Sequence, residues 1–64
     1  METNNKVLAA ILEAYKDYQE SRKKGLSTVA CDMKYEYFKG LRKAVVLMGL
    51  RREWEEMREA YDNE

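Results

Sequence analysis

Basic side chains form the densest group of residues that could bind a ligand or partner. Lys39, Arg42 and Lys43 follow one another at helical spacing, and Arg51 and Arg52 extend the group. Such a set can hold phosphates of a nucleic acid or surround a protein contact, where arginine is often a hot spot. The total charge is balanced, 12 basic against 12 acidic residues, and the C-terminal turns are acidic, which favours the protein contact.

A docking surface is predicted around these bases. Tyr35 and Val46 lie off the apolar rows described below, so both are expected at the surface. We therefore expect a protein partner to contact Tyr35, Lys39, Arg42, Lys43 and Val46, with Arg51 and Arg52 secondary. The alternative is nucleic-acid binding, with phosphates held by Lys39, Arg42, Lys43, Arg51 and Arg52.

Other chemistry is poorly supported. Cys31 falls early in a predicted helix, where a thiolate could be stabilised, but no histidine and no second cysteine accompany it. The carboxylate pairs Glu13 with Asp17 and Glu55 with Glu59 lie off the apolar rows, and dinuclear metal sites of helical bundles usually also use histidine. We expect no catalytic residue, no metal and no cofactor, and hence no enzyme.

The composition is that of a small helical protein. Proline is absent, glycine occurs 3 times in 64 residues, and helix-forming residues dominate. A single cysteine cannot form an internal disulfide, so packing and self-association must provide stability. No apolar run is long enough to span a bilayer, and an unpaired cysteine fits a reducing compartment. We expect a single all-α domain over residues 1–64, in the cytoplasm, without membrane contact.

The first helix is predicted over about residues 5–24. Its apolar stripe has steps of three, four and three residues: Leu8, Ile11, Tyr15 and Tyr18. Gly25 is suited to the left-handed residue that ends a helix, and Leu26 can close a Schellman motif. Ser27 or Thr28 can then cap the next helix. Residues 25–28 are therefore a short turn between antiparallel helices.

The second helix is predicted over about residues 28–62. Its apolar row has steps of three or four residues throughout: Ala30, Met33, Tyr37, Gly40, Ala44, Leu47, Leu50, Trp54, Met57 and Tyr61. A second row, Phe38, Leu41, Val45 and Met48, lies beside it. The residues after Gly49 offer no Ser, Thr, Asp or Asn as a cap, which favours one long helix. The alternative is a compact monomeric three-helix bundle with a break near Gly49.

A long second helix predicts a homodimer. It extends roughly 50 Å, whereas the first helix reaches only roughly 30 Å, so its apolar end is left uncovered. The expected fold is thus an all-α antiparallel two-helix hairpin that self-associates into a helical bundle. We expect self-association through Leu41, Val45, Met48, Leu50, Trp54, Met57 and Tyr61.

These features predict a small accessory or regulatory protein that binds a larger protein stoichiometrically, by occlusion or scaffolding. In general character, rather than in any residue motif, the chain resembles the short two-helix proteins encoded by bacteriophages and mobile elements of Gram-positive bacteria. That resemblance implies a phage accessory protein, an inhibitor or an adaptor, that acts on a larger host or phage protein.

Overall fold

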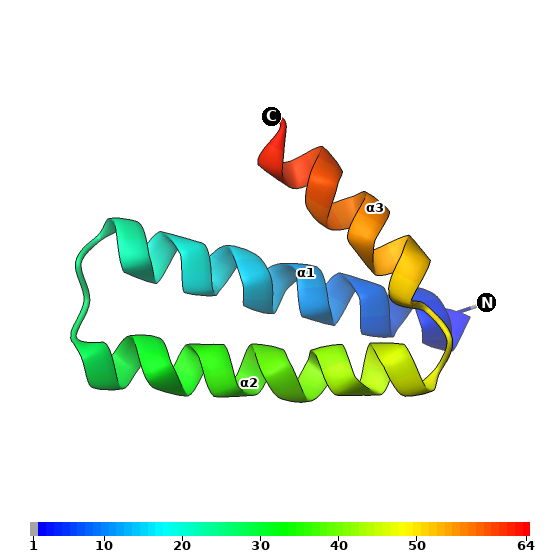
Figure 1. The fold of residues 1–64 in the computed structure, drawn as a ribbon, viewed down its shortest axis with the longest axis horizontal. Helices are drawn as coiled ribbons and strands as arrows, with labels where there is room; N and C mark the ends of the chain where they lie inside the picture. The colour runs from blue at the N-terminus through cyan, green and yellow to red at the C-terminus, as the bar shows by residue number, and fades with distance from the viewer. Residues whose placement is uncertain (1) are drawn as a thin grey trace.

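A computed structural model describes residues 2–64, and all the regular structure in this range is helical. The elements are α1 (Glu2–Lys23), α2 (Thr28–Leu47) and α3 (Arg51–Asp62). Figure 1 shows α1 and α2 running antiparallel side by side, while α3 turns back from the end of α2 and runs obliquely past α1. The fold is therefore all-α. Helix α1 begins earlier than expected, at Glu2 rather than near residue 5.

The turn between α1 and α2 closes with two backbone hydrogen bonds. Gly25 has φ 71°, its N–H donates to the Arg22 carbonyl at 3.2 Å, and the Leu26 N–H donates to the Ser21 carbonyl at 3.1 Å. This is the Schellman geometry, in which a left-handed residue satisfies the last free carbonyls of the helix. Ser27 then caps α2, because its Oγ accepts the Ala30 N–H at 3.2 Å.

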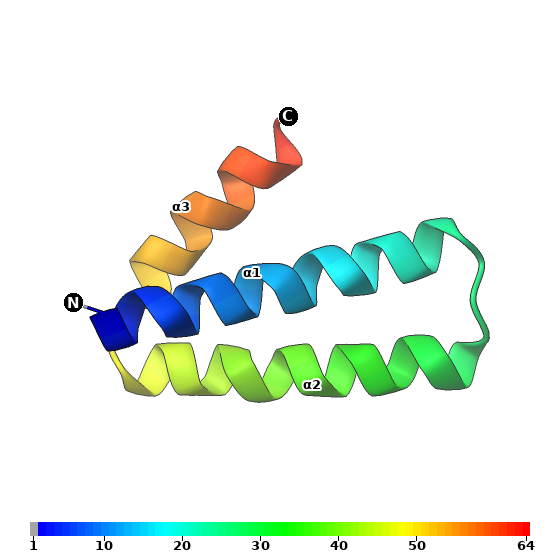
Figure 2. The same ribbon diagram turned by 180° about the vertical axis from the view of Figure 1, so that it is seen from behind.

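The same geometry occurs a second time at Gly49, and the prediction of one continuous helix over 28–62 is therefore wrong. Gly49 has φ 74°, its N–H donates to the Val46 carbonyl at 3.1 Å, and the Leu50 N–H donates to the Val45 carbonyl at 2.9 Å. Helix α2 ends at Leu47 and α3 begins at Arg51. Figure 2, the reverse view, shows the two turns at opposite ends of the α1–α2 pair. The break corresponds to the alternative with three helices.

Helix α3 begins without a side-chain cap. Leu50 occupies the cap position, makes no side-chain hydrogen bond to the helix, and accepts the Trp54 N–H at its carbonyl at 3.0 Å. What holds this turn is burial, because Leu50 is 7% exposed and Trp54 is 3% exposed. Removing two large apolar side chains from water is worth several kcal/mol at about 25 cal/mol per Å². That exceeds the roughly 1 kcal/mol that a polar cap contributes.

The core lies where the three helices meet, and its centre is aromatic. The Tyr15 ring lies 5.6 Å from the Phe38 ring, 5.6 Å from the Trp54 ring and 5.8 Å from the Tyr61 ring, between centroids. The contacts with Trp54 and Tyr61 are edge to face, the geometry that aromatic pairs prefer. The remaining buried apolar residues are Ile11, Ala14, Val45 and Leu50.

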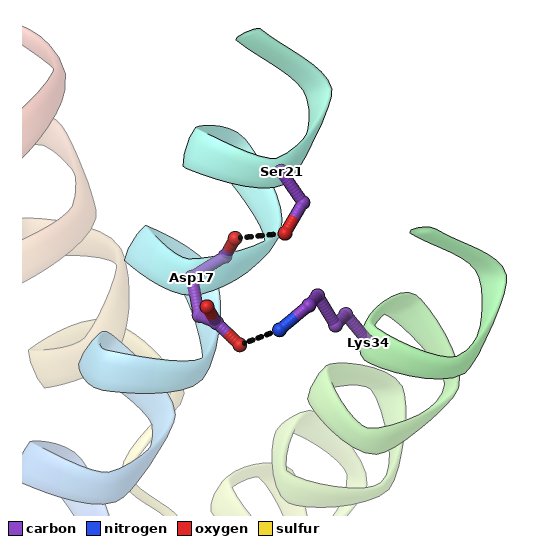
Figure 3. A network of polar contacts seen from close by, with 3 residues as sticks. All are labelled: Asp17, Ser21 and Lys34. Carbon is purple, nitrogen blue, oxygen red and sulfur yellow. Dashed lines mark hydrogen bonds and ion pairs between the residues drawn. The ribbon is translucent and has the colours of Figure 1, made fainter. Parts of the chain in front are cut away.

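A polar network joins α1 to α2 near their turn. The Lys34 ammonium donates to the Asp17 carboxylate, and the Ser21 hydroxyl donates to the Asp17 carbonyl at 2.8 Å (Figure 3). Ser21 is only 3% exposed, so without this hydrogen bond its hydroxyl would be buried with no partner. The ion pair itself is partly exposed and contributes little free energy, so it links the two helices without determining how they pack.

The helix break gives opposite predictions for two glycines. Gly49→Ala places a side chain at positive φ and lowers the free energy of unfolding by about 1–2 kcal/mol, because an L-residue is strained there. Gly40→Ala, within α2, raises it by about 0.5–1 kcal/mol through helix propensity. Nothing lies within 4 Å of an added Cβ at either site of the single chain, so within one chain backbone conformation alone separates the variants. Urea unfolding followed by circular dichroism, at a concentration at which the protein is a monomer, measures both. If Gly49→Ala is as stabilising as Gly40→Ala, the helix is continuous.

Candidate functional site

Three of the predicted partner residues line a hollow between α2 and α3. Arg42 and Val46 come from α2, and Arg51 comes from the start of α3. The hollow has a volume of about 160 Å³. We call it the arginine hollow, and its lining consists of Tyr15, Phe38, Arg42, Val46, Arg51, Trp54, Glu55 and Arg58.

The arginine hollow combines an aromatic floor with a basic rim. Phe38 and Trp54 in the floor are buried core residues with ring centroids 5.8 Å apart, so the floor is rigid. On the rim, Arg51 Nε donates to Glu55 Oε1 at 3.3 Å. Within residues 2–64, no ion pair involves Arg42 or Arg58. The rim therefore carries excess positive charge and two guanidinium groups that can donate to a carboxylate.

Tyr35 and Lys39 extend this surface along α2. Tyr35 is 39% exposed, and its ring lies 5.2 Å from the Tyr18 ring and 6.4 Å from the Phe38 ring. Lys39 Nζ lies 5.3 Å from the centre of the Tyr35 ring, a cation–π contact. Tyr35, Lys39, Arg42 and Val46 thus follow one side of α2 at steps of four, three and four residues.

Two predicted partner residues lie neither in the arginine hollow nor on its extension along α2. Lys43 and Arg52 are exposed, but neither lines the hollow. Helical periodicity places Lys43 about 40° around α2 from Lys39, at the edge of this surface, and it places Arg52 on the side of α3 away from Trp54. The structure therefore gathers Lys39, Arg42 and Arg51 around one surface, with Lys43 at its edge and Arg52 elsewhere.

The sequence reasoning did not identify Glu55 and Arg58 as site residues. Both follow Arg51 on one face of α3, at i+4 and i+7, so their shared side could be recognised from spacing. Their proximity to Arg42 depends on α3 turning back at Gly49. With one long helix these side chains would lie far beyond Arg42.

Six of the residues predicted for self-association are packed within the single chain. Val45, Leu50 and Trp54 are buried, and Leu41, Met57 and Tyr61 are partly buried against the same core. Met48 differs, since it is 41% exposed. The uncovered apolar end that suggested a homodimer does not exist, because α3 folds back and covers it. A contact of these residues with a second chain stays a prediction.

A different apolar surface is uncovered. It follows α2 through Met33, Tyr37, Gly40, Ala44 and Leu47, which we call the α2 apolar row. Met33 is 70% exposed, Tyr37 is 63% exposed and Leu47 is 79% exposed. Beside its N-terminal half lies a groove of about 690 Å³, lined by residues of α1 and α2 alone: Ala10, Glu13, Ala14, Lys16, Asp17, Glu20, Met33, Lys34 and Tyr37.

Comparison of the chain with protein-family models, curated proteins and solved structures finds no match. No helix within residues 2–64 is both long enough and apolar enough to cross a bilayer. The functional argument therefore rests on the surfaces described above.

Tyr15 lies in the floor of the arginine hollow, and its hydroxyl donates to the Asp62 carboxylate, 2.9 Å from Oδ1. Burial raises the pKa of Tyr15 above its ordinary value of 10.0. The hydrogen bond to Asp62 and the negative charge of that residue raise it further. The neutral phenol is therefore the form that the folded state favours.

This raised pKa predicts alkaline destabilisation. The stabilising contribution of the neutral Tyr15 phenol to the free energy of unfolding is fully present below the pKa of Tyr15 in the unfolded chain, about 10. It is lost as the pH rises through the higher pKa of Tyr15 in the folded state. Tyr15→Phe removes it, so the free energy of unfolding of this variant falls less steeply above pH 10 than that of wild type. Urea unfolding between pH 7 and 11 measures both proteins. If the free energy of unfolding depends on pH in the same way in wild type and in Tyr15→Phe, the raised pKa of Tyr15 is contradicted.

Proposed function

We propose that this protein is a non-enzymatic accessory or regulatory protein that binds a larger protein stoichiometrically through the arginine hollow. The observation that carries the proposal is the combination of a rigid aromatic floor with arginines on the rim. Arginine and aromatic residues provide most binding energy in protein interfaces, and a preformed concave surface lowers the entropy cost of binding.

The chemistry of the hollow suggests the partner segment that fits it. Arg42 and Arg58 can each donate to a carboxylate, while the aromatic floor can contact an apolar side chain. A volume of about 160 Å³ accommodates one side chain rather than a helix or a larger ligand. We therefore infer an acidic partner segment that inserts one apolar or aromatic residue between the arginines.

Site-specific photo-cross-linking tests this proposal. A benzoylphenylalanine at Val46, on the edge of the hollow, should cross-link to one protein in the cells of origin. The same group at Ala60, exposed elsewhere on α3, should not give this product. With the purified partner, Arg42→Glu should raise the dissociation constant at least about tenfold, since it removes one charged contact and creates a repulsive one. Lys24→Glu makes the same charge change in the turn between α1 and α2, at the opposite end of the helix pair from the α2–α3 turn, and should change binding less than about twofold. Equal cross-linking at both positions would contradict the proposal.

Nucleic-acid binding remains the second candidate, and the ion pairs reduce its support. Lys39 Nζ lies 3.8 Å from a Glu36 carboxylate oxygen, and Arg51 is paired with Glu55, so carboxylates accompany two of the five bases. Neighbouring acids repel a phosphate backbone.

Titration with duplex DNA and RNA at low salt distinguishes the two functions. We expect no gel shift. A shift that weakens steeply with salt, and that the triple change Lys39→Ala, Arg42→Ala and Lys43→Ala abolishes, would support nucleic-acid binding instead.

A further inference from the structure

The α2 apolar row is an uncovered apolar surface that the proposed function does not use. It lies on a different side of α2 from Val46 and Arg42. Leu47 follows Val46 directly in sequence, but a helix turns about 100° per residue, so the two side chains belong to separate surfaces. An exposed row with three large apolar side chains is typical of an interaction site.

We propose that a second copy of this chain binds the α2 apolar row, with the two α2 helices antiparallel and crossing at Gly40. The ends of the row are symmetric about this residue, because Met33 precedes Gly40 by seven positions and Leu47 follows it by seven. A two-fold axis through Gly40 therefore brings Met33 of one chain level with Leu47 of the other. Two-fold symmetry is the most common arrangement in protein dimers.

The sizes of the side chains in the row are complementary in this arrangement. Gly40 lies at the crossing point, and nothing lies within 4 Å of the position of its missing Cβ, so the two helices can approach closely. Tyr37 of one chain comes level with Lys43 and Ala44 of the other, which places its ring over a small side chain. On α1, Ala10 and Ala14 are the small residues of the adjoining groove and leave room for the neighbouring helix.

The charges along the edge of the row are also complementary. Glu36 and Lys43 lie on the same edge, since they are seven residues apart, and the Glu36 side chain is 71% exposed. In an antiparallel pair the same edges face each other, so Glu36 of one chain comes within one residue of the level of Lys43 of the other. Symmetry repeats this ion pair. In a parallel pair about the same row opposite edges face each other, so Glu36 and Lys43 of the two chains lie on opposite sides of the contact and form no such pair.

The available area is sufficient for a stable pair. Helix α2 has 20 residues, which corresponds to about 30 Å, and two adjacent helices are about 20 Å wide. A face of this size gives about 600 Å² per chain, or about 1,200 Å² for two chains, where stable interfaces begin.

The first test is the mass in solution over a dilution series, measured by sedimentation equilibrium in reducing buffer. Wild type should have twice the 7.6 kDa mass of one chain. Leu47→Glu should raise the dissociation constant of the dimer at least about 100-fold, because symmetry places the new charge at both ends of the apolar contact. Leu47 is 79% exposed in the single chain, so the variant keeps its helix content. Val46→Glu makes the same chemical change one residue away and should remain a dimer.

Disulfide cross-linking then tests the direction of the pair. In a Cys31→Ser background, chains with Met33→Cys mixed with chains with Leu47→Cys should form a mixed disulfide under mild oxidation. Each variant alone should form little disulfide, because position 33 of one chain lies beside position 47 of the other chain and not beside its own symmetry mate. Met33→Cys mixed with Val46→Cys is the matched control and should stay reduced.

Three results would overturn the proposal: wild type that sediments at 7.6 kDa at millimolar concentration, a dimer that Leu47→Glu leaves intact, or a disulfide between two Met33→Cys chains. Failure of this proposal is distinguishable from failure of the proposed function. Val46→Glu should impair binding of the larger protein and retain the dimer, whereas Leu47→Glu should do the reverse.

Discussion

The aromatic contact centred on Tyr15 is the interaction on which the remaining structure depends. Its ring contacts Phe38 of α2 and both Trp54 and Tyr61 of α3, and its hydroxyl bonds to Asp62. One residue of α1 thus joins the other two helices. A domain of 64 residues buries only about 60% of its unfolded surface, so a few large side chains must supply much of the stability. Without this cluster, α3 would lose the contacts of Trp54 and Tyr61 with α1 that hold it in its folded-back position.

The position of α3 determines which surfaces of α2 remain available. Helices α1 and α3 cover the sides of α2 that carry Phe38 and Val45, both buried. The side with Met33, Tyr37 and Leu47 receives no cover from either. The arginine hollow lies on a third side of α2, where α3 approaches it. A single helix therefore contributes to the core, to a basic surface with aromatic residues and to an apolar row.

The sequence identified the helical class and the end of α1, but it did not identify the end of α2. Gly25–Leu26 and Gly49–Leu50 are the same dipeptide, and both form Schellman motifs. The first is followed by Ser27, a recognisable cap, whereas the second is followed by Arg51. Apolar periodicity could not reveal the break, because α3 packs into the same core and its spacing continues in phase. Nor could spacing show which row of α2 is buried, since that depends on where α3 lies. The side shared by Tyr35, Lys39, Arg42 and Val46 followed from helical spacing alone, whereas the contribution of Arg58 required the tertiary fold.

The turn at Gly49 makes α3 a lever. Its 12 residues extend for roughly 18 Å, so a rotation of about 10° at the turn displaces its far end by about 3 Å. Arg51, Trp54 and Glu55 lie near the pivot, and Asp62 lies at the tip. The hydrogen bond between Tyr15 and Asp62 therefore restrains α3 at the end where a rotation about the turn causes the largest displacement. This hydrogen bond at the tip of α3 therefore opposes the rotation that would widen the hollow near its base.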